Sequence, residues 1–133
     1  MAGMTVVFAD DTAIMRERLA ELLSGIEGIE VVGKAGDAME AERLIRSLSP
    51  DIAIIDLRMP GGGLNLLKRI EEVEGRKPLV IVLTAYPFPQ YRTRSLELGA
   101  SYFFDKSHDM ERLVTTLRGL AAAQAGGLDR ERT

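Results

Sequence analysis

Short apolar segments alternate with longer amphipathic segments along the whole chain. Five of the short segments have the length and composition of β-strands, and they span residues 5–9, 29–35, 52–56, 79–83 and 101–104. The first, third and fourth are apolar on both faces, which is typical of strands inside a parallel sheet that is covered on both sides. The second also carries Glu30 and Lys34 and therefore favours an edge position.

The segments between these strands carry apolar residues at helical spacing. The five stripes consist of Met15, Leu19, Leu22, Leu23 and Ile26; Met39, Leu44, Ile45 and Leu48; Leu66, Leu67, Ile70 and Val73; a weakly apolar group within residues 90–98; and Met110, Leu113, Val114, Leu117 and Leu120. Stop signals support two of these helices, because Ser49-Pro50 follows the second stripe and Gly99 follows the fourth.

Five strand–helix repeats predict an α/β fold with a doubly wound, five-stranded parallel sheet. Right-handed crossover connections leave few strand orders, and the order 2-1-3-4-5 places the first and third strands side by side. We assign residues 4–122 to this domain and residues 123–133 to a short C-terminal tail. The tail is too short for an output domain, so we expect the domain to stand alone.

Length and composition fit one domain with a hydrophobic core, because the chain has 133 residues of which 46% are hydrophobic. Its 17 basic and 20 acidic residues give a net charge of -3, which argues against direct binding of nucleic acid. The absence of cysteine excludes thiolate catalysis and zinc–thiolate sites. The sequence shows neither a signal peptide nor a membrane-spanning apolar run, so we expect a cytoplasmic protein.

Reactive side chains follow several of the predicted strands. Asp10 and Asp11 follow the first strand, and Asp56 ends the third. Thr84 follows the fourth strand, and Lys106 comes shortly after the fifth. Ligands of open parallel sheets bind beyond the carboxyl ends of the strands, where the strand order reverses. If the order is 2-1-3-4-5, these side chains therefore meet at one crevice.

Three carboxylates in one crevice repel each other, so protons, a lysine or a metal cation must offset their charge. Mg²⁺ suits this set, because it takes one or two carboxylates and leaves its other positions to water and phosphate oxygens. A carboxylate beside that ion can attack phosphorus and form an acyl phosphate. Lys106 would add a positive charge and Thr84 a hydroxyl, so the residues predict a phosphoryl-transfer site.

Each residue also has a structural interpretation that does not involve catalysis. Asp10, Asp11 and Thr12 could cap the first helix, and Asp56 could be a turn residue. Thr84 could be an ordinary strand residue and Lys106 a solvated surface lysine. The coincidence of all of them at one edge of the sheet favours the functional interpretation.

Four motifs occur in order along the chain. They are Asp10-Asp11, residues 54–60 (IIDLRMP), residues 83–85 (LTA) and residues 99–106 (GASYFFDK). Together they resemble the receiver domain of two-component response regulators, in the stand-alone form typical of chemotaxis regulators. The resemblance covers nearly the whole chain and implies a flavodoxin-like fold.

The resemblance implies a role for each residue of the acidic crevice. Asp56 would accept a phosphoryl group from a histidine kinase or a histidine phosphotransfer protein, with Mg²⁺ as the cofactor. Asp11 would bind the Mg²⁺ directly, and Asp10 largely through water. Asp56 itself and the backbone carbonyl of Arg58 would complete the protein's share of the metal coordination.

The resemblance also implies a switch. Lys106 would pair first with Asp56 and then with the phosphoryl group. Thr84 would reorient toward the phosphoryl group, and Phe103 would swing inward behind it. The output would be contact with a downstream effector protein, with no direct contact to nucleic acid or membrane, from a monomer or a weak homodimer.

The competing function is that of a small-molecule phosphatase that works through an aspartyl phosphate. Such phosphatases usually carry a second acid two residues after the nucleophile, and that position here holds Arg58. We therefore expect no enzymatic activity beyond Mg²⁺-assisted self-phosphorylation and autodephosphorylation.

The chain departs from the family pattern at three positions. Lys106 precedes Ser107 where receivers often have a Lys-Pro pair with a cis bond, and the sequence does not decide whether the bond here is cis. Gly63 follows Pro60 by three residues rather than four, so the loop is one residue short. Phe103 lacks the hydroxyl of a tyrosine switch, so we expect its preference between the outward and inward positions to be either weaker or biased inward.

Residues 86–91 (YPFPQY) combine two prolines with three aromatic rings. We favour a rigid loop with buried rings, and the alternative is a docking surface for a partner. Tyr86 and Arg58 occupy the positions two residues after Thr84 and Asp56, where the family tunes loss of the phosphoryl group. We expect them to shield it and to slow autodephosphorylation.

Overall fold

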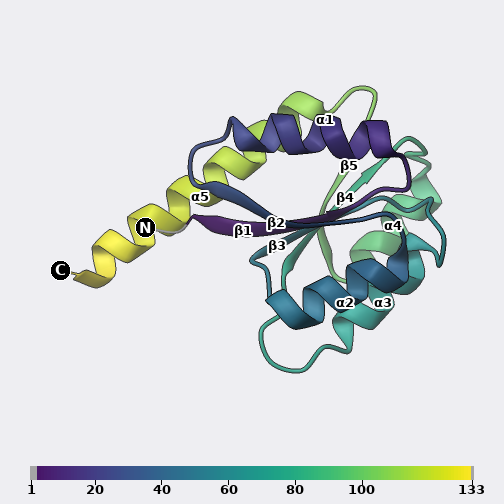
Figure 1. Ribbon diagram of the computed structural model, residues 1–133, viewed down its shortest axis with the longest axis horizontal. Coiled ribbons are helices and arrows are strands. Elements are labelled where there is room, and N and C mark those ends of the chain that lie inside the picture. Colours follow the sequence, from purple (N-terminus) through teal and green to yellow (C-terminus); the bar gives the residue numbers. More distant parts are fainter. Residues whose placement is uncertain (1–2, 133) are drawn as a thin grey trace.

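The computed structural model describes residues 3–132 and shows a parallel sheet between two layers of helices (Figure 1). The strands are β1 (Met4–Ala9), β2 (Ile29–Ala35), β3 (Ile52–Ile55), β4 (Leu79–Thr84) and β5 (Ala100–Asp105). The helices are α1 (Ala13–Ser24), α2 (Ala38–Leu48), α3 (Gly63–Glu71), α4 (Pro89–Glu97) and α5 (Met110–Arg132). The strand order β2-β1-β3-β4-β5 confirms the predicted doubly wound sheet.

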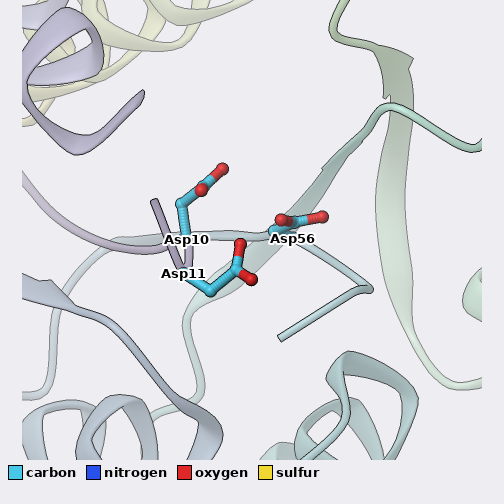
Figure 2. A group of neighbouring side chains, drawn as sticks. All are labelled: Asp10, Asp11 and Asp56. Carbon is cyan, nitrogen blue, oxygen red and sulfur yellow. The ribbon is translucent and has the colours of Figure 1, made fainter. Parts of the chain in front are cut away.

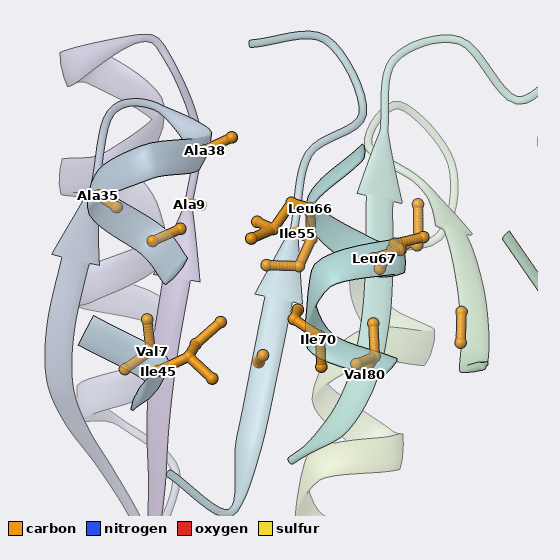
Figure 3. Packing of buried hydrophobic residues seen from close by; sticks show 14 of the residues in the cluster. Val7, Ala9, Ala35, Ala38, Ile45, Ile55, Leu66, Leu67, Ile70 and Val80 are labelled. Carbon is orange, nitrogen blue, oxygen red and sulfur yellow. The ribbon is translucent and has the colours of Figure 1, made fainter. Parts of the chain in front are cut away.

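Two hydrophobic cores lie on opposite faces of the sheet, because successive side chains of a strand point to opposite sides. Val7 and Ile55 join a cluster under α2 and α3, which Figure 3 shows from close by. Phe8 and Ile54 join the other cluster, under α1 and α5. This double burial explains why the central strands are apolar at every position.

Pairing between β1 and β3 determines where the functional side chains lie. The two strands run parallel with Ala9 opposite Ile55, so both end at the same edge of the sheet. The ladder continues one step further, because the Asp56 N–H donates to the Ala9 carbonyl at 3.0 Å and the Asp10 N–H donates to the Ala35 carbonyl at 3.0 Å. Asp10 and Asp56 are therefore held on adjacent, hydrogen-bonded backbone.

The predicted helix ends are confirmed by their local geometry. Thr12 caps α1 by accepting a hydrogen bond from the Met15 N–H. Ser49 has a φ of 45° and ends α2 directly before Pro50, and Gly99 has a φ of 99° just beyond α4.

The segment that we set apart as a tail continues α5 to Arg132 and extends away from the sheet (Figure 1). A run of three alanines at residues 121–123 favours helix at this point and explains the continuation. The domain boundary at residue 122 stays a prediction. None of the helices in the described part of the chain combines the length and hydrophobicity that a membrane span requires.

Candidate functional site

Three carboxylates converge at the carboxyl edge of the sheet, as Figure 2 shows. Asp10 and Asp11 come from the end of β1 and Asp56 from the end of β3, and each offers an oxygen within 4.8 Å of the others. Asp10 is 1% exposed and Asp56 is 5% exposed, whereas Asp11 faces solvent. The predicted convergence of these acids is therefore present in the structure.

Lys106 lies between the two buried carboxylates. Its Nζ contacts Oδ2 of Asp10 and lies 3.1 Å from Oδ2 of Asp56. Its backbone N–H donates to the Thr84 carbonyl at 2.9 Å, which fixes the start of the side chain beside β4. Burial alone would lower the pKa of Lys106, but hydrogen bonds and attraction to the two carboxylates outweigh it and raise that pKa. Lys106 is therefore a partly buried partner of the two acids and not a fully solvated surface lysine.

Asp10 also organises the turn that follows β1. Its Oδ1 accepts hydrogen bonds from the Thr12 N–H at 3.0 Å and from the Thr12 hydroxyl at 3.1 Å. Its backbone carbonyl accepts one from Arg16 at 2.7 Å. The capping interpretation and the site interpretation are therefore compatible, because one oxygen of Asp10 serves the turn and the other contacts Lys106.

Asp56 is held in a partly desolvated position. Burial raises its pKa above the ordinary value of 3.8, and attraction to Lys106 and a hydrogen bond from the Arg58 N–H offset only part of that rise. That N–H lies 3.2 Å from Oδ1 of Asp56. Three carboxylates share one ammonium, so the ionised cluster keeps an excess of negative charge that a divalent cation would neutralise.

Replacing Asp56 with Asn is expected to stabilise the folded protein at neutral pH. Because the folded-state pKa is raised, the folded protein holds its proton more tightly than the unfolded chain does. Stability therefore falls as the pH rises from below 3.8 through the folded-state pKa, and the Asn variant avoids this loss. A tenfold difference in proton affinity between the folded and unfolded states corresponds to about 1.4 kcal/mol.

Urea unfolding in a metal chelator, at a series of pH values, measures this effect. We expect the Asn variant to be more stable than the parent at neutral pH, and we expect the difference to disappear in acid. An Asn variant that is less stable than the parent at neutral pH would contradict the prediction.

In the described residues, Thr84 and Phe103 form no hydrogen bond to the acids. The Thr84 side chain is fully buried, and its hydroxyl accepts a hydrogen bond from the Tyr86 N–H at 3.1 Å. Phe103 points inward and belongs to the core cluster beneath α2 and α3. Thr84 ends β4, the strand that pairs with β3, and Phe103 lies on β5, which pairs with β4.

The β3–α3 loop is as short as its spacing predicts, and glycines permit the shape. Gly61 and Gly62 have φ values of 87° and 81°, which side chains rarely adopt. Gly63 begins α3, and its N–H donates to the Leu57 carbonyl at 3.0 Å. The loop therefore folds back tightly onto the residues that follow β3.

The β5–α5 loop holds Lys106 without a proline. The described residues contain no cis peptide bond, so the bond from Lys106 to Ser107 is trans. Asp105 accepts from the Ser107 N–H at 2.8 Å and lies 3.0 Å from Nδ1 of His108, and these contacts lower the pKa of Asp105. The Asp105 N–H in turn donates to Asp109 at 2.9 Å.

The structural role of Asp105 and Asp109 was not predicted from the sequence. The available signal was a pair of acids one residue before and three residues after Lys106. Asp residues at such spacings commonly accept hydrogen bonds from nearby backbone N–H groups. Together the two carboxylates close the turn around Lys106.

The expectation of buried rings in residues 86–91 was wrong. Tyr86 is 38% exposed, Phe88 is 50% exposed and Tyr91 is 37% exposed. The guanidinium carbon of Arg58 lies 4.4 Å from the centre of the Tyr86 ring, so these two side chains cover each other. The two prolines restrict the backbone of this loop without turning its rings into the core.

The fold and the site define a doubly wound α/β domain with an acid–lysine cluster at the edge where ligands of such sheets bind. The chain matches the family model described as the response regulator receiver domain over residues 6–118, and it belongs to that family. Receiver domains accept a phosphoryl group in two-component signalling, and they generally bind Mg²⁺ in an acidic pocket.

Named relatives agree with this assignment. The response regulator GacA of Pseudomonas aeruginosa is 32% identical over 122 residues, which is 90% of this chain and 56% of that protein. An uncharacterized response regulatory protein of Vibrio cholerae is 36% identical over 118 residues, which is 88% of this chain and 48% of that protein. The chain thus spans about half the length of these relatives.

Solved structures share the fold over nearly the whole chain. The signal receiver domain of the putative response regulator NarL from Mycobacterium tuberculosis is 29% identical with a TM-score of 0.80, covering 96% of this chain and 99% of that one. A two-component response regulator of the LuxR family from Aurantimonas is 32% identical with a TM-score of 0.82, covering 92% of this chain and 87% of that one.

Proposed function

We propose that this receiver accepts a phosphoryl group on Asp56 from a histidine kinase or a histidine phosphotransfer protein, in a Mg²⁺-dependent reaction. The observation that carries the proposal is the position of Asp56 at the end of β3, 3.1 Å from Lys106 and beside two further carboxylates. A nucleophilic carboxylate, a fixed cation and additional acids form the combination that phosphoryl transfer to a side chain needs.

The acidic cluster fits Mg²⁺ by its chemistry, because its free ligands are carboxylate oxygens. The exposed Asp11 would bind the ion directly together with Asp56 and the backbone carbonyl of Arg58. Asp10 would act largely through water, since its oxygens already contact Lys106 and Thr12. The ion supplies charge neutralisation for the phosphoryl oxygens when it is bound.

In the reaction, a carboxylate oxygen of Asp56 forms a bond to phosphorus. The bond from phosphorus to the imidazole nitrogen of the donor histidine breaks, and the imidazole takes up a proton. Lys106 already lies at Oδ2 of Asp56, so its ammonium needs only a small movement to pair with the phosphoryl oxygens.

Signal output follows from Thr84 and Phe103. In the proposed active state the Thr84 hydroxyl turns to the phosphoryl group and gives up its hydrogen bond from the Tyr86 N–H. Phe103 is already buried, so the inward position that we expect of the active state is also the resting one. A downstream effector protein would then recognise the altered β4–α4 region, with this chain acting as a monomer or a weak homodimer.

The proposal is tested by intact mass after incubation with acetyl phosphate and Mg²⁺. The parent protein should gain one phosphoryl group, and the Asp56→Asn variant should gain none. A phosphoryl adduct that persists in the variant would place the acceptor elsewhere and overturn the assignment.

The phosphatase alternative can be tested with a generic aryl phosphate. Arg58 occupies the place of the second acid, and its guanidinium stacks on Tyr86 instead of reaching a leaving group. We therefore expect no turnover. Single-domain organisation and a cytoplasmic location stay predictions.

Loss of Asp105 is expected to slow phosphorylation several-fold while leaving the fold intact. In Asp105→Ala the turn after Lys106 loses its acceptor for the Ser107 N–H, so the ammonium is held less firmly beside Asp56. Asp105→Asn keeps an acceptor oxygen and should restore most of the rate. Initial rates with acetyl phosphate measure both variants, and equal rates for Ala and the parent would contradict the prediction.

Shielding by Arg58 and Tyr86 is expected to prolong the life of the acyl phosphate. Arg58 and Tyr86 follow Asp56 and Thr84 by two residues, and their stacked side chains would hinder the approach of water to Asp56. Replacing both with Ala should shorten the half-life several-fold, which the decay of the phosphorylated mass reports. A half-life of seconds in the parent protein would contradict the shielding hypothesis.

A further inference from the structure

A pocket of about 300 Å³ lies between the β3–α3 loop and the start of α4. Leu57, Arg58 and Leu64 line one side, and Tyr86 and Tyr91 line the other. The pocket is separate from the acidic cluster, because none of Asp10, Asp11 and Asp56 lines it. The shielding role proposed above uses Arg58 and Tyr86 of this lining, but no role has been proposed for Leu57, Leu64 and Tyr91.

Exposed aromatic rings lie in the wall of this pocket and beside it. Tyr86, Phe88 and Tyr91 all belong to one short segment, and each exposes more than a third of its surface. The ring centres of Phe88 and Tyr91 lie 6.0 Å apart, so the two rings form a continuous apolar surface. Aromatic residues and arginine are the side chains most enriched in protein interfaces and their hot spots.

The charge of this region is mostly positive, although the whole chain has a net charge of -3. Residues 57–65 and 85–96 contain Arg58, Arg92 and Arg94 and no acidic residue. Glu97 at the end of α4 pairs with Arg94 at 3.4 Å, so Arg58 and Arg92 carry the positive charge of the surface. A partner segment with acidic side chains therefore complements the surface. Nucleic acid is a poorer fit, because the three carboxylates of the neighbouring site repel a chain of phosphates.

We propose that this aromatic–basic surface binds an acidic segment of a partner protein, which inserts an apolar side chain into the pocket. The acidic side chains of the segment pair with Arg58 and Arg92, and the inserted side chain packs between Leu57, Leu64 and Tyr91. The occupant is a protein segment and neither a nucleic acid nor a second copy of this chain.

Binding at this surface is coupled to Asp56, and this part of the inference rests on the proposed function. One wall of the pocket follows Asp56 directly, and the other begins at Tyr86, whose N–H donates to the Thr84 hydroxyl. When Thr84 turns to a phosphoryl group, Tyr86 loses that bond and its wall is free to move. Phosphorylation then changes the affinity of the surface for the segment. By linkage, the bound segment changes the phosphorylation equilibrium of Asp56 by the same factor.

Selection of a random phage-displayed peptide library on the full chain, without Mg²⁺ or phosphoryl donor, tests the surface. We expect enriched peptides with acidic residues around one large apolar side chain. Their binding should shift the amide NMR signals of residues 57–65 and 85–96. Arg58→Ala and Tyr91→Ala should each weaken binding about tenfold, and Arg43→Ala on the exposed side of α2 is the matched control.

Several outcomes would overturn the proposal. These are peptides without an acidic excess, signal shifts at other elements, competition by single-stranded oligonucleotides, or self-association that covers the same amides. The coupling is tested separately by repeating the titration after phosphorylation, where a changed affinity supports it and an unchanged affinity refutes it. Because selection needs no phosphoryl group, failure of the proposed function and failure of the surface give different results.

Discussion

Lys106→Met is expected to destabilise the folded protein by about 3 kcal/mol at neutral pH, the order found when one partner of a buried ion pair is removed. Lys106 is the ammonium that contacts the two buried carboxylates of Asp10 and Asp56. Methionine has a similar shape but no charge, so it leaves both acids without their cation. The loss of stability therefore comes from the missing positive charge and not from a cavity.

The pH dependence separates this explanation from a general packing defect. Burial already raises the pKa of Asp56, and loss of Lys106 removes the main influence that lowers it. The folded variant therefore takes up a proton at a higher pH than its unfolded chain does, and its stability relative to the parent recovers as the pH falls.

Urea unfolding in chelator across a pH series measures the effect. Lys106→Arg keeps the charge and should lose much less stability than the methionine variant. Equal stability of the methionine variant and the parent at neutral pH would contradict the prediction, and so would a deficit that does not shrink in acid.

The location of the site was predictable because parallel strands place their carboxyl ends at one edge. Asp10 and Asp56 follow strands that are visibly apolar on both faces, and the observed register of β1 and β3 brings them together. Lys106 could be placed on the same argument, since β5 runs parallel to β4. Strand pattern and strand order therefore suffice to bring these side chains to one crevice.

The environment of each side chain was not predictable in the same way. Asp10 and Asp11 are neighbours in sequence, yet one is buried against Lys106 and the other is exposed, because successive residues leave a strand in opposite directions. The rings of residues 86–91 lie in the loop before α4 and in its first turn, where they stay exposed, and the buried residue of α4 is the small Ser95. Such outcomes depend on packing between elements, which residue spacing does not encode.

Gly63→Ala is expected to destabilise the protein by about 3 kcal/mol, at the upper end of the usual cost of overpacking. A Cβ atom at this position would lie 2.5 Å from the Asp56 carbonyl oxygen and 2.5 Å from the Leu57 Cα. Both are backbone atoms, so no side chain can rotate away. The start of α3 or the end of β3 must move instead.

The displacement falls on the residue that carries the proposed chemistry, so phosphorylation of Asp56 should slow as well. Gly119→Ala is the control, because a Cβ atom there meets nothing within 4 Å in the middle of α5. That variant should gain about 0.5 to 1 kcal/mol, since alanine favours helix over glycine. Urea unfolding measures the stability of both variants, and acetyl phosphate kinetics measure how fast each is phosphorylated. A Gly63→Ala protein with parental stability and rate would show that the β3–α3 loop is not held against Asp56 and that its short length does not constrain the acceptor.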